Sequence, residues 1–380
     1  MSRVLSTYRR LTIKVGSALL VDAKTGKLRA DWLASLAEDL AALHAEGREI
    51  VIVSSGAIAL GRRILGLNAR TLHLEESQAA ASAGQIALSQ AWRDALGKHD
   101  ITTGQILITP NITEERRYYL NARVTIRTLL ALKAVPIINE NDSVATAEIR
   151  YGDNDRLSAR VAVMVEADCL ILLSDVDGLY TAPPAIDPNA AHIPFVEEID
   201  AGIERMAGGA ASHLSRGGMT TKIEAARIAT QSGTAMIVSR GTEPHPLAAL
   251  DDGARHTLFA ATQSPAAARK RWILGTLDVF GTIHVDEGAV RALESGKSLL
   301  PIGVTRVKGD FSRGDAVSIV GPDGHEVARG LVGMSTEEAD LAKGKKSQAV
   351  QDLVGFGNRT EMVHADNLAL LSTKWGGSGK

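Results

Sequence analysis

The chain has 380 residues, of which 45% are hydrophobic and 23% are charged, and its formal net charge at pH 7 is −2. These values exclude a disordered chain and are typical of a globular protein with about two or three domains. The near balance of charge argues against a nucleic-acid binder that works by bulk electrostatics, and no uncharged apolar run approaches the length of a membrane span. The single cysteine, Cys169, lies in an apolar run, which fits a reducing cytosol, so we expect a cytoplasmic protein.

Apolar runs that predict buried strands alternate along the chain with amphipathic stretches that predict helices. The expected strands lie at residues 11–15, 49–53, 105–109, 136–138, 168–173 and 235–238. This alternation predicts an α/β fold with a mainly parallel sheet and right-handed crossovers. Open sheets of this kind bind ligands at the carboxyl ends of their strands, so the segments that follow the strands are the candidate site.

Two of the expected helices, at residues 77–96 and 119–134, have apolar residues at helical spacing. We expect both to pack on the sheet. Their candidate core residues are Ile86, Leu88, Trp92 and Leu96 in the first helix and Leu120, Val124, Leu129 and Leu132 in the second. Tyr118 and Tyr119 are expected to be packing residues as well.

Small residues follow the first two strands. Lys14 precedes Gly16 at the end of the first strand, where glycine lets a ligand approach the backbone. The second strand runs into Ser54, Ser55 and Gly56, whose hydroxyls and free amides at the start of a helix can receive anionic groups. A plain helix cap is the alternative interpretation of the two serines.

The central stretch from Pro136 to Val161 is rich in carboxylates and asparagines. Residues 139–142 (NEND) follow a short apolar strand, and residues 152–155 (GDND) form a turn before a helix expected to start near Arg156. Carboxylates bind ammonium groups and hard cations, and asparagine can also donate a hydrogen bond. The stretch therefore suits a polar substrate with an ammonium group, a metal, or both; two solvated turns and a helix cap are the alternative.

Two further segments carry candidate phosphate-binding groups. Ser174 and Asp175 follow an apolar strand, and residues 215–222 (SRGGMTTK) precede a helix. Glycines expose backbone amides, hydroxyls donate hydrogen bonds and Lys222 supplies a positive charge, so the second segment is a candidate phosphate cradle. It differs from the standard P-loop pattern, and a surface loop is the alternative.

Composition changes between residues 243 and 272, and short β-rich pieces separated by glycine and aspartate follow, as in a small barrel. We expect five parts, and the last is a tail rich in glycine. They are a flexible arm at residues 1–10, an α/β domain at 11–262, a linker at 263–275, a β-rich domain at 276–371 and a disordered tail at 372–380.

Six motifs together resemble the glutamate 5-kinase branch of the amino-acid kinase family, with a carboxyl-terminal PUA domain. They are IKVGS, VIVSSGAIALG, LNAR, INENDSVATAEIRYGDND, LLSDVDGLYT and GGMTTK. The resemblance implies a three-layer sandwich around a mainly parallel open sheet, followed by a small β-rich PUA-like barrel. It also implies phosphorylation of the γ-carboxylate of L-glutamate by ATP with Mg²⁺, the first step of proline biosynthesis.

The resemblance also implies roles for individual residues. The implied catalytic residues are Lys14, Lys222 and Asp175. The implied glutamate-binding residues are Ser55, Asp142 and Asn154, with Asp153 and Asp155 as candidates for the substrate ammonium or, through water, the metal. The implied ATP-binding residues are Lys14, Ser174, Asp175, Arg216, Gly217, Gly218, Met219, Thr220, Thr221 and Lys222. The direct ligands of the metal are left open.

Two positions depart from the family pattern. Ser174 stands where the family has threonine, a change that keeps the hydroxyl, and Ser215-Arg216 stand where the family has a glycine and a threonine. Arg216 therefore either reaches the nucleotide differently or points outward.

The chemistry fits the residue types. A carboxylate acceptor is already an anion at neutral pH, so its attack on phosphorus requires no general base. Lys14 and Lys222 can neutralise charge on the phosphoryl oxygens, and we expect Asp175 to orient the two lysines.

The resemblance further implies feedback inhibition by proline, a homodimer or homotetramer, and glutamyl-phosphate reductase as a partner enzyme. Two other classes of function are alternatives. One is RNA binding or modification through the PUA-like domain, which the acidic balance of charge disfavours as the main function. The other is a regulatory sensor that binds glutamate without turning over ATP.

Overall fold

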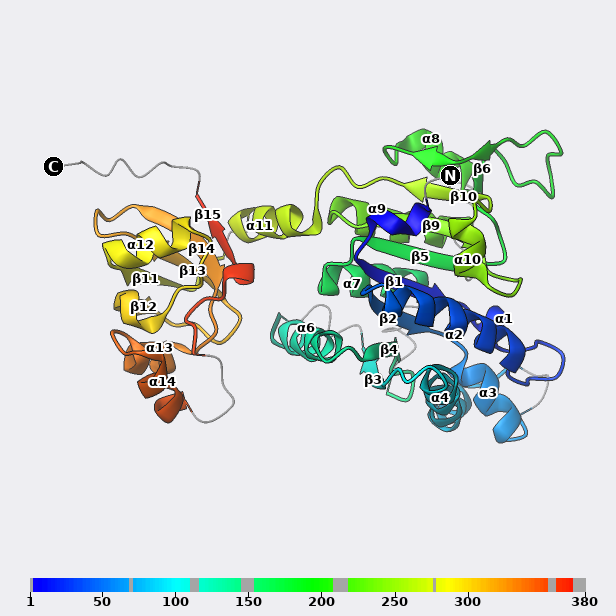
Figure 1. Ribbon diagram of the computed structural model, residues 1–380, viewed down its shortest axis with the longest axis horizontal. Coiled ribbons are helices and arrows are strands. Elements are labelled where there is room, and N and C mark those ends of the chain that lie inside the picture. The colour runs from blue at the N-terminus through cyan, green and yellow to red at the C-terminus, as the bar shows by residue number, and fades with distance from the viewer. Residues whose placement is uncertain are drawn as a thin grey trace. The chain divides into compact units, whose positions relative to one another are not determined.

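The computed structural model describes residues 3–67, 71–109, 116–144, 154–207, 218–275, 278–354 and 360–371. The chain divides into two compact units, residues 1–265 and residues 266–380 (Figure 1). Each unit has buried apolar side chains of its own. Within the described ranges, no helix combines the length and the apolar character that spanning a bilayer requires.

The first unit is built on an eight-stranded sheet. In spatial order its strands are β3 (Thr103–Ile108), β4 (Val135–Glu140), β2 (Glu49–Ser54), β1 (Arg10–Val15), β5 (Cys169–Ser174), β9 (Ala235–Arg240), β10 (His256–Phe259) and β8 (Phe195–Val196). The strands from β3 to β9 in this order are mutually parallel, and β10 runs antiparallel to β9. The expectation of a mainly parallel open sheet is confirmed.

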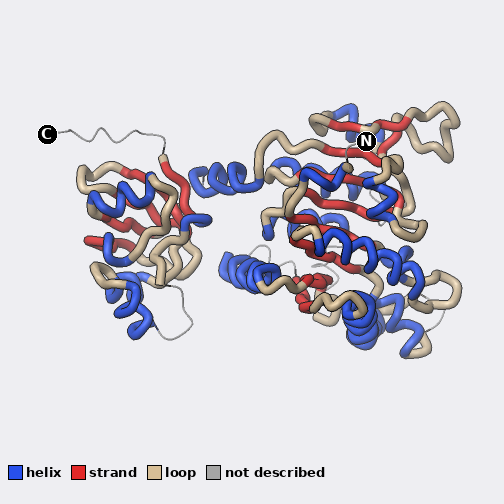
Figure 2. Tube along the Cα trace, viewed as in Figure 1, coloured by secondary structure: helices blue, strands red, loops and turns tan. Residues whose placement is uncertain are grey.

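Helices cover both faces of this sheet, so the unit has three layers (Figure 2). One face packs against α1 (Ser17–Leu20), α2 (Ala30–Ala45), α3 (Ala57–Ile64), α4 (Leu74–Gly97) and α10 (Pro246–Asp251), and the other against α6 (Arg116–Ala131), α7 (Asn154–Val165) and α9 (Met219–Gln231). Successive strand residues point to opposite faces. In β2, Ile50 and Ile52 therefore enter the first core, and Val51 and Val53 enter the second.

Because the central strands are parallel, their carboxyl ends lie along one edge of the sheet. Val15 at the end of β1 is paired with Ser54 of β2 and with Leu173 of β5. Ser174, the last residue of β5, is paired with Arg240 of β9. The turns after β1, β2, β5 and β9 are therefore neighbours, as the candidate site requires.

The long helices α4 and α6 bury only some of the apolar residues that were predicted to lie in the core. Leu88, Trp92 and Leu96 of α4 are buried, but Ile86 is 75% exposed. A residue two positions from Leu88 lies about 200° around the helix, so Ile86 faces away from the sheet. This part of the core prediction is wrong.

The same geometry corrects the prediction for α6. Its buried side chains include Ile126 and Leu130, which are one turn apart. Val124 and Leu132 each lie two positions from one of these residues, and they are 42% and 73% exposed. Tyr118 is also exposed, so it is not a packing residue.

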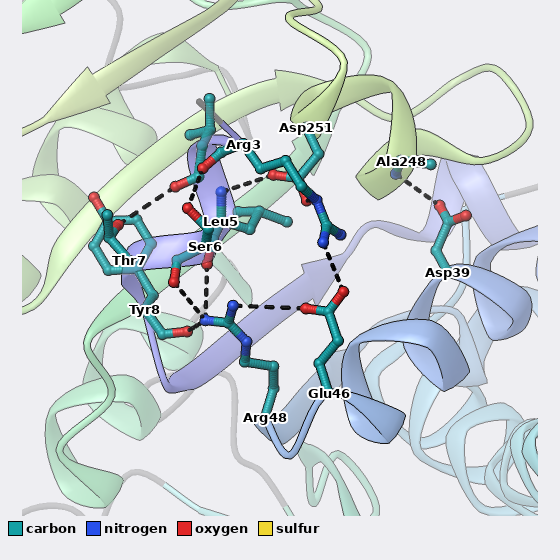
Figure 3. A network of polar contacts seen from close by, with 11 residues as sticks. Arg3, Leu5, Ser6, Thr7, Tyr8, Asp39, Glu46, Arg48, Ala248 and Asp251 are labelled. Atoms are coloured by element: carbon teal, nitrogen blue, oxygen red, sulfur yellow. Dashed lines mark hydrogen bonds and ion pairs between the residues drawn. The ribbon is translucent and has the colours of Figure 1, made fainter. Parts of the chain in front are cut away.

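The amino-terminal segment is not a flexible arm over the residues that the structure describes, which begin at residue 3. Residues Val4–Thr7 form the 3-10 helix η1, and Leu5 is 1% exposed. The Leu5 amide and the Arg3 guanidinium both donate to the buried carboxylate of Asp251, at 2.7 and 3.0 Å (Figure 3). Arg48 donates to carbonyls of the same segment. These contacts fix the segment on the first unit.

Residues 263–275, expected as a linker, are mostly helical. Helix α11 spans Pro265–Gly275. Its Arg269 donates to the carbonyl of Asp366 at 3.1 Å and to the side chain of Asn367 at 2.8 Å, and the Leu274 carbonyl accepts from Arg329. These partners all belong to the second unit, so most of the expected linker is part of that unit.

The second unit contains a five-stranded, mainly antiparallel sheet. Its order is β12 (Val304–Gly309), β11 (Gly281–Val285), β13 (Ala316–Val320), β14 (Glu326–Leu331) and β15 (Leu368–Leu370). The accompanying helices are α12 (Glu287–Glu294), α13 (Thr336–Ala342) and α14 (Ser347–Val354). The expectation of a β-rich carboxyl-terminal part is confirmed, and the expected tail at residues 372–380 lies outside the described residues.

Candidate active site

The centre of the candidate site is a buried carboxylate that contacts two lysines. Asp155 is the second residue of α7 and is 1% exposed. Its Oδ1 lies 2.7 Å from Nζ of Lys14, at the end of β1, and its Oδ2 lies 3.1 Å from Nζ of Lys222, in the first turns of α9. Three segments that are far apart in the sequence thus meet in one group, which we call the lysine–aspartate cluster (Lys14, Asp155, Lys222).

Opposing effects determine the ionisation of Asp155. Burial raises the pKa of its carboxyl group, but the attraction of the Lys14 and Lys222 ammonium groups outweighs burial and lowers the pKa below its ordinary value. Asp155 is therefore ionised at neutral pH. Two ammonium groups and one carboxylate give the lysine–aspartate cluster one net positive charge.

The packing of α7 against α9 explains how Lys222 reaches this position. Both helices present alanines to their shared core, among them Ala159, Ala162, Ala225 and Ala226, which are fully buried. Small side chains let the two helix axes approach closely. The Thr221 hydroxyl contributes as well, since it lies 2.8 Å from the Gly218 carbonyl and 3.3 Å from Oδ2 of Asp155.

Ser55 and Asn154 form the neighbouring half of the site. The side-chain amide of Asn154, the first residue of α7, donates to the hydroxyl of Ser55, which directly follows β2. The Ser55 backbone amide donates to the Val15 carbonyl at 3.0 Å. Since Asn154 precedes Asp155 and Val15 follows Lys14, this pair lies beside the lysine–aspartate cluster.

Asp142 lies in the turn after β4 and is half-buried. It lines a cavity of about 280 Å³ together with Asn141 and Ser143 of the same turn, Gln85 of α4 and Gln105 of β3. At the end of β4, the side-chain amide of Asn139 donates to Gln85 at 2.8 Å. The polar residues after β4 therefore face α4, and the predicted glutamate ligand Asp142 is accessible from a cavity.

On the other side of β1, Ser174 ends β5 and donates its hydroxyl to Asp175 at 3.0 Å. Asp175 is exposed, and the carboxylate that contacts both lysines is Asp155. The hypothesis that Asp175 orients the lysines is therefore wrong. Asp155, in turn, is occupied by the lysines, which disfavours it as the ligand of a substrate ammonium group.

Parts of two predicted motifs lie outside the described residues. These are Asp153, the residue before α7, and Arg216 and Gly217, which precede α9 in the sequence. The remainder of the second motif is described: Gly218 is the N-cap of α9, and Met219, Thr220, Thr221 and Lys222 form its first turns. A glycine-led helix start beside two lysines is a suitable receptor for phosphate oxygens. Within the described ranges, no group of three or more metal-ligating side chains occurs.

Sequence reasoning missed Arg240 and the polar contacts made by α4. Arg240 ends β9 beside Ser174, and its guanidinium lies 3.6 Å from the carboxylate of Asp177. The predicted strand at residues 235–238 stopped two residues before Arg240, and no role was assigned to that residue. Trp92 was expected to be a packing residue, yet its indole N–H donates to Ser54 at 2.8 Å. No local signal distinguishes that tryptophan from an ordinary core residue.

Comparisons with known proteins identify the family of the chain. The model of the amino acid kinase family matches residues 9–239, which include the lysine–aspartate cluster and the parallel strands from β3 to β9 except Arg240, the last residue of β9. The chain belongs to the amino acid kinase family. A PUA domain model matches residues 281–354, within the second unit.

Curated relatives match almost the whole chain. It is similar to glutamate 5-kinase from Rhodopseudomonas palustris (strain BisA53), with 59% identity over 366 residues, 96% of this chain and 97% of the relative. Glutamate 5-kinase 1 from Rhizobium meliloti (strain 1021) is 59% identical over 97% of this chain and 93% of its own. Among solved structures, UMP kinase from Ureaplasma parvum aligns with a TM-score of 0.46 at 16% identity, over 66% of this chain and 98% of that one.

Proposed function

We propose that the chain transfers the γ-phosphoryl group of ATP to the γ-carboxylate of L-glutamate, which yields L-glutamyl 5-phosphate and ADP in the first step of proline biosynthesis. The observation that carries the proposal is the convergence of Lys14 and Lys222 on Asp155, directly beside Ser55 and Asn154. Similarity to glutamate 5-kinases over nearly the whole chain, at 59% identity, supports it.

Repulsion between anions is the main barrier to this reaction. The acceptor carboxylate is itself the nucleophile, so the site has no proton to remove from it. In this proposal the acceptor carboxylate and the phosphates meet at the net positive lysine–aspartate cluster. Each ammonium group can then stabilise negative charge on the transferred phosphoryl group. Loss of one such preorganised donor typically lowers kcat by about 100-fold to 1,000-fold.

Asp155 acts on the lysines rather than on the substrate in this proposal. Its two oxygens fix both Nζ atoms at 2.7 and 3.1 Å before any ligand binds. Preorganisation of this kind reduces the reorganisation that charge development would otherwise require. Without the carboxylate, two neighbouring buried ammonium groups would repel each other.

The glutamate pocket combines donors and acceptors that match an amino acid. We assign the substrate ammonium group to Asp142 and Asp153. Ser55 and Asn154 can hydrogen-bond the substrate carboxylates, since both carry donor groups. This division suits glutamate, which has an ammonium group at one end and the reacting carboxylate at the other.

Nucleotide binding is assigned to the opposite side of β1. Ser174 and Asp175 follow β5, and residues 216–222 supply backbone amides, hydroxyls and Lys222. Mg²⁺ in kinases is held by substrate phosphates and one or two carboxylates, and the exposed carboxylate of Asp175 fits that role. When bound, the metal would neutralise charge on the β- and γ-phosphates.

Trapping of the acyl phosphate with hydroxylamine tests the reaction. Lys222→Ala is expected to lower hydroxamate formation by about 100-fold or more because it removes a buried donor from the transition state. Lys98→Ala, at an exposed position after α4, is the matched control and should keep full activity. Wild-type turnover by a folded Lys222→Ala protein would refute the proposal.

Competition between acceptors tests the substrate. Glutamate, aspartate and N-acetylglutamate differ in chain length or in the ammonium group that Asp142 is proposed to bind. We expect turnover with glutamate alone at substrate concentrations that saturate it. Equal turnover of N-acetylglutamate would contradict the assignment of the ammonium group to a carboxylate.

Regulation and assembly are part of the proposal. Proline would inhibit by competing with glutamate. An increase in the KM for glutamate as the proline concentration rises would support this.

The exposed apolar side chains of Ile86 on α4 and of Val124 and Leu132 on α6 favour a homodimer or homotetramer, which light scattering would reveal. We also propose a cytoplasmic location and transfer of the product to glutamyl-phosphate reductase.

A further inference from the structure

One polar pair in the core of the first unit has no part in the functions described so far. Trp92 of α4 and Ser54 of β2 are both fully buried, and the indole N–H of Trp92 donates to the Ser54 hydroxyl oxygen at 2.8 Å. The other buried residues of β2 are apolar. A buried hydroxyl without a partner destabilises a core, so an apolar residue here would serve packing alone equally well.

The hydroxyl of Ser54 also connects this pair to the next residue. Its proton is directed to the carbonyl of Ser55 at 3.2 Å. Because the Ser54 oxygen already accepts a hydrogen bond from the indole N–H, the hydroxyl orientation that donates to the Ser55 carbonyl is favoured. Trp92, Ser54 and the Ser55 carbonyl thus form a continuous chain of hydrogen bonds from α4 to the end of β2.

Ser55 is held on its other sides as well. Its amide donates to the Val15 carbonyl at 3.0 Å, and its hydroxyl accepts from Asn154. With the carbonyl fixed by Ser54, both peptide groups and the side chain of Ser55 have defined partners. Only the carbonyl contact depends on Trp92 and Ser54.

We infer that Trp92 and Ser54 are positioning residues that orient Ser55 for the acceptor amino acid. The inference rests on the proposed role of Ser55 and Asn154 in glutamate binding. It assigns the two residues an effect on the acceptor alone, since the lysine–aspartate cluster is held by different contacts.

Steady-state kinetics of Ser54→Ala, Trp92→Phe and the double variant test this inference. Ser54→Ala removes the hydroxyl with little change of shape. Trp92→Phe removes the indole N–H and also shortens a buried ring, so it needs a control for the lost volume. We expect the KM for glutamate to rise about fivefold to tenfold, which is the net size of a neutral hydrogen bond, while kcat and the KM for ATP change less than about twofold. The double variant should be no worse than the more affected single variant, because both act through one chain of bonds.

Trp32→Phe is the matched control. Trp32 of α2 is also buried, and its indole N–H donates to the Gly241 carbonyl at 2.8 Å, a contact that does not reach Ser55. It should leave the KM for glutamate unchanged even if the melting temperature falls. A parallel rise in this KM for Trp32→Phe and Trp92→Phe would mean a general loss of stability and would overturn the inference.

Ser55→Ala and Asn154→Ala separate this inference from the proposed function. If both raise the KM for glutamate and folded Ser54→Ala does not, the positioning role is refuted and the binding role stands. If neither raises it, the glutamate site itself is refuted, and the inference with it. Additive effects of Ser54→Ala and Trp92→Phe on the KM for glutamate would also refute the inference, because they would mean that the two residues do not act through one chain of hydrogen bonds. If the Trp92→Phe protein does not fold, the KM of Ser54→Ala alone tests the inference.

Discussion

At the scale of single residues, Asp155 determines the electrostatics of the site. It is 1% exposed and contacts two ammonium groups, which are themselves nearly buried. Removing one partner from a buried ion pair commonly destabilises a protein by about 3–5 kcal/mol, because the remaining charge stays desolvated. The same carboxylate is thus required both for the fold around α7 and for the arrangement of the lysines.

Asp155→Asn should lower kcat by about 100-fold or more, since both lysines lose the group that fixes them. KM values for ATP and glutamate should change far less than kcat. The measurement is steady-state kinetics of the purified variant with its melting temperature. Asp252→Asn, at an exposed position after α10, is the control and should retain activity. A kcat within about threefold of wild type would contradict the role of Asp155 as a positioning group.

The lowered pKa of Asp155 predicts how stability depends on pH. A carboxyl group whose pKa is lower in the folded state contributes stability above its unfolded pKa, and this contribution is lost as the pH falls through the folded pKa. The difference in unfolding free energy between wild type and Asp155→Asn should therefore be largest near neutral pH and shrink below the ordinary value of 3.8. Urea titrations from pH 7 to pH 3 measure it. A difference independent of pH would contradict the ion pair.

At the scale of elements, the crossing of α3 and α4 determines the position of Ser55 after β2. A Cβ atom on Gly84 of α4 would lie 1.8 Å from the Ala57 carbonyl, and one on Gly61 of α3 would lie 1.7 Å from the Ala80 carbonyl. Only glycine at both positions permits this approach. Because α3 starts two residues after Ser55, the crossing also positions the turn at the proposed glutamate site.

Gly84→Ala should destabilise the first unit by about 1–3 kcal/mol through overpacking and should raise the KM for glutamate. Gly97→Ala is the matched control on the same helix, because nothing lies within 4 Å of a Cβ atom there. It should be neutral or stabilising by up to about 1 kcal/mol, as alanine favours helix. Thermal unfolding and kinetics of both variants measure the contrast. Equal effects of the two changes would contradict the close crossing.

The amino-terminal segment is a second element whose attachment can be tested. Asp251→Ala leaves the Leu5 amide without its buried acceptor, and we expect a loss of about 1–3 kcal/mol. Glu46 contacts the same Arg3 from a more exposed position, so Glu46→Ala should have a smaller effect (Figure 3). Urea unfolding compares the two. An equal loss for both would mean that the segment is held by surface charge instead of the buried carboxylate.

At the scale of the whole molecule, the two units have separate cores. The described residues assigned to the candidate site belong to the first unit, which has a core on each face of its sheet. The second unit, which matches the PUA domain, has its own core around Ile283, Ile319 and Val350. Ligands of the site should therefore stabilise one unit directly and not the other.

Hydrogen exchange in the presence of glutamate and a non-hydrolysable ATP analogue should show this division. At about 100 times the dissociation constant, ligand adds about 2.7 kcal/mol to the stability of the unit that binds it, so its slowest amides should exchange about 100-fold more slowly. Peptides from β1, β2, α7 and α9 should show this protection. Comparable protection of residues 281–354 would contradict separate stabilisation of the two units.

Sequence patterns were sufficient to predict the alternation of strands and helices, the parallel sheet and the turns that carry Lys14, Ser55 and Lys222. Strand and helix patterns, glycine turns and the family motifs are local in the chain, so they can be recognised without coordinates. They also predicted that these turns share one edge, since parallel strands end on the same side.

Tertiary structure alone decided which of these groups touch. Asp155, 67 residues before Lys222, became the partner of both lysines in place of Asp175. The tertiary structure also showed that Asp251 contacts the amino-terminal segment and that Trp92 donates a hydrogen bond to Ser54. It showed as well that Ile86 and Leu132 are exposed. The physical reason is that periodicity fixes the face of a helix only approximately. Ion pairs and buried hydrogen bonds depend on how helices pack across the sheet, and local sequence patterns do not predict that packing.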